Sequence, residues 1–156
     1  MHLEATLVPA EPSDVLELDE LWSFVHSRKN KRWVWVALCR RTRQVVSYAL
    51  GDRSEVTCRK LWGSLPSAYQ KSQVYTDFWE AYSQVVPKAQ HFPVGKESGQ
   101  TNHVERWNNT LRQRLARFVR KTLSFSKCEK MHEQCLLLYL HHYNINMAPT
   151  IANNTK

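Results

Sequence analysis

The chain has 156 residues, of which 42% are hydrophobic and 23% charged, a globular composition at a length that suits one domain and argues against disorder. The longest apolar runs, such as CLLLYL, are too short to span a bilayer, so a membrane protein is not expected. Lysine and arginine (22) outnumber acidic residues (14), and the net charge of +8 favours a polyanionic partner, nucleic acid first.

The first half of the chain predicts three antiparallel strands. Residues 1–13 carry two prolines without clear periodicity, and we expect a tail or linker there. Bulky and β-branched residues then predict strands at 15–25, 33–39 and 44–51. The basic stretches HSRKNKR and RRTR that connect them are short, which favours antiparallel neighbours.

The second half alternates strands with helices. In chain order we expect a helix at 54–64, a strand at 72–77, a helix at 78–86, a strand at 90–94, a long helix from near 101, a helix at 126–143 and a polar tail at 147–156. This order predicts a single α/β domain over 14–146, with a mixed five-stranded sheet flanked by helices. It matches the ribonuclease H-like fold, although order alone leaves other α/β sheets open.

Two aspartates stand at unusual positions in the predicted strands. Asp19 lies inside the strand LELDEL, where an acid needs a partner or a metal unless the strand is at an edge. Asp77 ends the strand VYTD, and the carboxyl ends of strands in α/β sheets are where ligands bind. The alternative for Asp77 is an N-cap of the following helix.

Glu105 is the only acid in the basic helix TNHVERWNNTLRQRLARFVRK. One face of this helix is apolar and predicts its core side: Val104, Trp107, Leu111, Leu115 and Phe118. Glu105 and Arg112 are seven residues apart and share the edge of that face. Glu105 has a structural alternative, because it could form a capping box with Asn102 or complement the positive helix N-terminus.

Taken together, Asp19, Asp77 and Glu105 suggest a phosphodiester-processing site. Two or three convergent carboxylates can hold a pair of divalent cations that activate the attacking oxygen and steady the leaving one. Oxygen ligands select Mg²⁺ or Mn²⁺. Glu17 shares a strand face with Asp19 and Glu20 lies on the opposite face, so either acid could be mistaken for the ligand.

Three motifs, LELDELWSFV, VYTDFWEAY and NHVERWNNTLRQRLARFVRKTLSFSK, resemble the DDE transposases of the insertion-sequence-one family over roughly residues 14–145. The resemblance implies a ribonuclease H-like catalytic domain in which Asp19, Asp77 and Glu105 are the catalytic, metal-binding triad for two ions. It also implies a DNA contact at Arg112, seven residues beyond the glutamate. The expected reaction is cleavage at element ends followed by strand transfer from the 3′-OH into target DNA.

Further expectations accompany this resemblance. Additional DNA-binding residues are expected along the same helix: Arg106, Asn109, Arg114, Arg117, Arg120 and Lys121. Two ends must be paired in transposition, so a homo-oligomer is expected, and recognition of the ends is expected from an upstream zinc-binding helix-turn-helix protein or fused domain. The scattered cysteines indicate a reducing, cytoplasmic location, at the bacterial nucleoid. The alternatives are a nuclease without strand transfer and an inactive DNA-binding remnant or regulator.

Overall fold

The computed structural model describes the backbone of residues 2–24, 31–121 and 129–154, and the side chains of 2–22, 32–114 and 133–149. Its centre is one sheet with strand order β3-β2-β1-β4-β5. The strands are β1 (Val15–Phe24), β2 (Lys31–Cys39), β3 (Val45–Gly51), β4 (Gln73–Thr76) and β5 (His91–Pro93). The first three are antiparallel, whereas β4 runs parallel to β1 and β5 parallel to β4. The predicted mixed five-stranded sheet is therefore confirmed.

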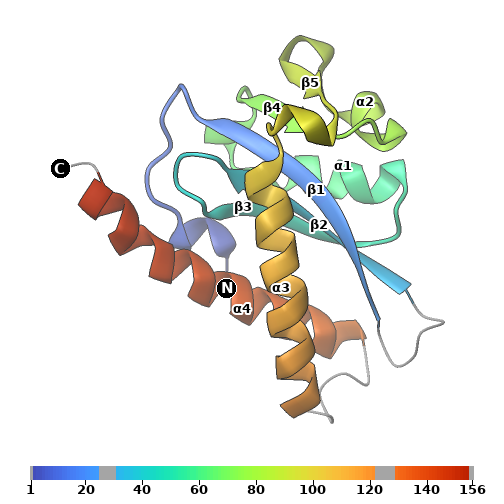
Figure 1. Cartoon of the computed structure of the whole chain (residues 1–156), viewed down its shortest axis with the longest axis vertical. Helices are drawn as coiled ribbons and strands as arrows, with labels where there is room; N and C mark the ends of the chain where they lie inside the picture. Colours follow the sequence, from blue (N-terminus) through green and yellow to red (C-terminus); the bar gives the residue numbers. More distant parts are fainter. Residues whose placement is uncertain (1, 25–30, 122–128, 155–156) are drawn as a thin grey trace.

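Helices cover both faces of this sheet (Figure 1). They are α1 (Glu55–Gly63), α2 (Glu80–Val85), α3 (Asn102–Lys121) and α4 (Glu129–Asn154). Four short 3₁₀ helices also occur: η1 (Leu3–Thr6), η2 (Ser67–Tyr69), η3 (Lys88–Gln90) and η4 (Lys96–Ser98). None of the helices within the described ranges is long and apolar enough to cross a membrane.

The sheet is buried on both sides because successive side chains of a strand point to opposite faces. On β1, Leu16 and Leu18 pack in the cluster that includes Cys58 and Leu61 of α1. Leu21, three residues beyond Leu18, packs in the opposite cluster with α3 and α4. Burial on both faces suits a central strand, and it puts the neighbours Asp19 and Glu20 under opposite layers of helices.

The last helix is longer than the sequence predicts. A polar tail was expected from residue 147, but α4 continues to Asn154 with Pro149 inside it. The buried side chain of Asn144 accepts a hydrogen bond from Val45 N (2.8 Å) and donates to Val45 O (2.9 Å) and Thr6 Oγ1 (3.0 Å). This tertiary contact fixes the helix just before the expected tail, and no local sequence pattern reveals it.

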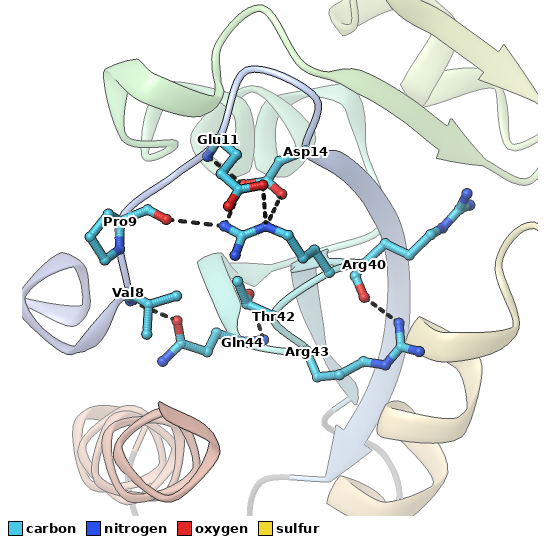
Figure 2. A network of polar contacts seen from close by, with 9 residues as sticks. Val8, Pro9, Glu11, Asp14, Arg40, Thr42, Arg43 and Gln44 are labelled. Carbon is cyan, nitrogen blue, oxygen red and sulfur yellow. Dashed lines mark hydrogen bonds and ion pairs between the residues drawn. The ribbon is translucent and has the colours of Figure 1, made fainter. Parts of the chain in front are cut away.

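The segment before β1, where a tail or linker was expected, contacts the turn between β2 and β3 (Figure 2). Arg41 Nε lies 2.6 Å from Asp14 Oδ1, Arg41 Nη2 donates to Pro9 O, and Val8 N donates to Gln44 Oε1. Burial alone would raise the pKa of Asp14, but hydrogen bonds from Arg41 and the Glu11 backbone hold it below its usual value. Residues 2–14 are thus anchored, while the division of the chain into tail and domain stays a prediction.

Candidate active site

The parallel pairing of β1 and β4 brings two of the predicted acids together. Leu16 pairs with Val74 and Glu17 with Tyr75, so Asp19 and Asp77 fall opposite each other two residues further along. β4 ends at Thr76, one residue before Asp77. Carboxylate oxygens of Asp19, Glu20 and Asp77 all lie within 4.8 Å of one another. Glu20 reaches this group from the opposite face of β1 because Asp77 lies just beyond the end of β4.

Helix α3 brings Glu105 to the same region. Val104, Trp107 and Leu111 are buried against the sheet, which confirms the predicted core face over its described part. Leu115 and Phe118 have side chains outside the described residues. Glu105 is half-buried and accepts a hydrogen bond from Thr101 Oγ1 (3.2 Å). Its carboxylate is not in the group of three that lies within 4.8 Å, although it lines the same cavity.

A cavity of about 330 Å³ joins these acids to several basic and amide side chains. Its lining consists of Asp19, Glu20, Leu21, Arg53, Asp77, Lys96, Glu105, Asn108, Asn109 and Arg112. Glu105 and Arg112 thus share one side of α3, as their spacing predicts. Four carboxylates and three cations meet in this small volume, which suits a ligand that combines negative charge with bound cations.

The other basic residues predicted to bind DNA lie elsewhere on α3. Arg106 and Arg114 are exposed and do not line the cavity. Arg117, Arg120 and Lys121 are on the last turns of the helix, and their side chains lie outside the described residues. The cavity therefore contains only Arg112 and Asn109 of the DNA-binding residues expected on this helix.

Asp19 is in an environment that disfavours its charge. β1 is the middle strand of the sheet, so the alternative of an edge-strand position is wrong. Burial, followed by the charges of Glu20 and Asp77, raises the pKa of Asp19 to about 7. The Asn108 side chain opposes this shift by donating a hydrogen bond to Asp19 Oδ2 (2.7 Å). A bound cation would relieve the remaining cost of the charged form.

Asp77 combines a local and a site role. Asp77 Oδ1 accepts a hydrogen bond from the backbone N–H of Trp79 (2.9 Å), which fixes the turn before α2. The capping alternative is correct to that extent, although α2 itself begins at Glu80. The second carboxylate oxygen makes no hydrogen bond with another described residue, so it is free to bind a ligand in the cavity.

Glu17, rather than Asn102 or Glu105, caps the start of α3. This fully buried carboxylate accepts hydrogen bonds from the backbone N–H groups of His103 (3.0 Å) and Val104 (3.2 Å) through Oε1. Its Oε2 accepts from Arg40 Nε (3.0 Å). The helix N-terminus is thereby tied to β1 two residues before Asp19.

Several residues of the cavity were not predicted as site residues. Asn108 lies three residues after Glu105 and four before Arg112, so helical spacing could have found it. Glu20 was considered but ranked below Asp19 as the ligand. Arg53 follows β3 directly and Lys96 lies in η4, and neither carries a sequence signal that distinguishes it from other surface cations.

Asn108 also carries an unusual oxygen. The residue is 4% exposed, and its Oδ1 is buried without a hydrogen-bond partner among the described residues. A buried carbonyl oxygen without a donor is costly. Next to several carboxylates it suits a hard cation or a water molecule bound to one.

Comparison with known proteins adds a family to this geometry. The family model described as "IS1 transposase" matches residues 14–146. The chain is 38% identical over 122 residues to the insertion element iso-IS1n protein InsB of Shigella dysenteriae, covering 78% of this chain and 90% of that protein. It is 37% identical over 129 residues to the insertion element IS1 protein InsB of Shigella flexneri, covering 81% and 95%.

Solved structures support the fold. The chain resembles the catalytic core domain of the integrase of HTLV-2, determined in complex with magnesium, with a TM-score of 0.55 at 14% sequence identity. The match covers 86% of this chain and 83% of that one. Together with the strand order, it confirms the predicted ribonuclease H-like fold.

Proposed function

Because the chain belongs to the IS1 transposase family, we propose that the cavity between β1, β4 and α3 is its catalytic site for DNA transposition. The observation that carries this proposal is the convergence of Asp19, Asp77 and Glu105 on one cavity from three separate elements. The substrate is DNA, first at the element ends and then at the target.

The proposed reaction has two phosphoryl transfers. In the first, water attacks the scissile phosphorus, the bond from phosphorus to the 3′ oxygen breaks, and that oxygen leaves protonated as a 3′-OH. In the second, this 3′-OH attacks a target phosphorus and displaces a target 3′ oxygen, which takes up a proton. One phosphodiester is formed for each one broken, so strand transfer needs no external energy source.

The donor set fits the divalent cations expected for this chemistry. Asp19 and Asp77 would hold Mg²⁺ or Mn²⁺, with Glu105 as the third carboxylate and Asn108 as an additional oxygen nearby. When bound, a pair of such ions supplies Lewis-acid stabilisation of the attacking and leaving oxygens.

The chain's own residues prepare this site. Asn108 holds Asp19 through one oxygen and leaves the other available. The Trp79 backbone does the same for Asp77. Arg112, on the same side of α3 as Glu105, would bind the scissile phosphate, because its planar fork can grip two phosphate oxygens. These contacts orient the reacting groups before DNA arrives.

The proposal extends to partners. Two element ends must be held together for transposition, so we expect a dimer or larger assembly of this chain on DNA. The exposed Arg106 and Arg114 would contribute contacts to the phosphate backbone that are independent of sequence.

The test is strand cleavage and joining on duplexes that carry the ends of the element encoding the chain. Asp19→Asn, Asp77→Asn and Glu105→Gln should each abolish cleavage in Mn²⁺ while the protein stays folded. Glu55→Gln, on the exposed side of α1, is the control that should cleave normally. Unchanged cleavage in one of the three variants would remove that residue from the site. Cleavage without joining would favour a nuclease, and DNA binding without any nicking would favour an inactive remnant.

A further inference from the structure

Arg53 is held at the wall of the catalytic cavity by aromatic rings and a buried acid. It follows β3 directly and precedes α1. Its guanidinium carbon lies 4.1 Å from the centroid of the Trp79 ring and 4.9 Å from that of Trp33. Two cation–π contacts restrict a side chain that would otherwise sample many rotamers.

The backbone around Arg53 is equally constrained. Trp79 Nε1 donates to the carbonyl of Arg53 (3.1 Å), and Trp35 Nε1 donates to the carbonyl of Asp52 (2.8 Å). The Asp52 carboxylate in turn accepts from Thr57 Oγ1 (2.9 Å) at the start of α1. The turn after β3 is thus joined to the turn that follows Asp77, and the position of Arg53 depends on the same segment that shapes the site.

Glu20 completes this arrangement. Its Oε1 accepts from Arg53 Nε (3.3 Å) and Nη2 (3.2 Å), and its Oε2 accepts a short hydrogen bond from the hydroxyl of the fully buried Tyr82. Both carboxylate oxygens of Glu20 are therefore engaged by the protein. By contrast, Asp19 and Asp77 each use one oxygen for a hydrogen bond to another side chain or turn. Glu20 is built to hold Arg53 rather than to bind a metal.

Arg53 still has donors to offer. Its side chain is 42% exposed, and Nη1 makes no hydrogen bond with any residue of the described structure. A guanidinium carries five N–H donors, so bonds to Glu20 leave part of the fork facing the cavity. Arg112 lines the cavity from α3, which covers the other face of the sheet. The two arginines approach the cavity from opposite layers of the fold.

We propose that Arg53 binds a backbone phosphate of the DNA strand in the cavity, on the side opposite Arg112, and that Glu20 is the positioning residue that holds it there. The inference rests on the proposed function, because a DNA strand must enter the cavity. A phosphate is the fitting ligand, since a planar fork matches two of its oxygens and the acids exclude an anion that arrives without cations. A side chain fixed in advance loses little entropy when it binds.

The experiment measures binding of a short fluorescein-labelled DNA duplex by anisotropy, in Ca²⁺ and over a range of KCl concentrations. Arg53→Ala should weaken binding about tenfold or more, since it removes a charge-assisted contact. It should also reduce the slope of log K against log[salt] by about 0.9, one phosphate contact. Arg53→Lys should keep the slope while binding with intermediate affinity, because lysine retains the charge but lacks the fork. Arg59→Ala, an exposed arginine on α1 paired with Glu55, is the matched control and should bind like the wild type.

The outcomes separate this inference from the proposed function. If the wild type binds with a normal salt slope and Arg53→Ala matches it in affinity and slope, the role of Arg53 is wrong and the proposed function stands. If the wild type shows no salt-dependent DNA binding, the proposed function fails as well. Thermal unfolding of each variant establishes that it is folded during the measurement, and Arg53→Lys serves if Arg53→Ala is not.

A second measurement tests Glu20. Glu20→Gln keeps the size of the side chain and one acceptor oxygen, so it should retain Mn²⁺ binding in calorimetry while binding DNA more weakly. Asp19→Asn provides the reference for loss of a proposed metal ligand. If Glu20→Gln loses Mn²⁺ as completely as Asp19→Asn does, Glu20 is itself a ligand and its assignment as a positioning residue is wrong.

Discussion

Replacing Glu17 by alanine should be among the most destabilising changes to the charged residues of this protein. Glu17 is 0% exposed, and its carboxylate accepts the N–H groups of His103 and Val104 and the guanidinium of Arg40. Glu17→Ala leaves two buried N–H groups of α3 without an acceptor and Arg40 without its acid. The helix that carries Glu105 then loses its attachment to β1.

The size of the effect follows from these contacts. Removing one partner of a buried ion pair costs about 3–5 kcal/mol, and each buried donor left without an acceptor costs about 1–3 kcal/mol. These terms overlap, and the side chain of Arg40 is 28% exposed and can regain water, so we expect a total loss of about 3–5 kcal/mol. For a domain of this size that corresponds to a fall in Tm of roughly 6–20 °C.

Urea and thermal unfolding measure this loss, and hydrogen exchange at the amides of His103 and Val104 locates it. Glu17→Gln keeps one acceptor oxygen, so it should lose about half as much. Glu55→Ala breaks a surface pair with Arg59 and should cost only about 0.3–0.5 kcal/mol. A loss below about 1 kcal/mol for Glu17→Ala, with unchanged exchange at both amides, would refute the reasoning that this acid anchors α3.

Three further outcomes follow from the site. Since burial raises the pKa of Asp19 from 3.8 to about 7, the stability it contributes without metal is present below the unfolded pKa of 3.8 and lost as the pH rises through about 7. Asp19→Asn should remove that part of the pH dependence of urea unfolding in EDTA, and an identical pH profile in wild type and variant would contradict this. Asn108→Ala should lower Mn²⁺ affinity or single-turnover cleavage by about 10–100-fold, because Asn108 orients Asp19; calorimetry and cleavage at saturating DNA measure it, and wild-type values would show that the contact is dispensable. Arg112→Ala should slow cleavage of bound DNA more than it weakens binding, whereas Arg114→Ala, outside the cavity, should do the reverse; if Arg114→Ala is the slower at saturation, the proposed orientation of α3 on DNA is wrong.

Local pattern was sufficient for most of the fold. Bulky residues bounded by turn signals predicted all five strands, and the spacing of Val104, Trp107 and Leu111 predicted the buried face of α3. The motifs around Asp19 and Asp77 also predicted their approach, because strand order and direction follow from short connections and alternating elements. These properties depend on residues that are neighbours in the chain, and a sequence displays them directly.

The support of the site could not be predicted in this way. Asn108 bonds to Asp19 across 89 positions, and Glu17 caps His103 across 86. Each contact requires the placement of α3 on the sheet to within a hydrogen-bond length, which no periodicity specifies. By itself the sequence determined the strands, the buried helix face and the acids of the site. Only the tertiary structure decided that Glu17 anchors a helix while Glu20 holds an arginine, because neighbouring carboxylates of equal chemistry are distinguished by the distant donors that packing brings to them.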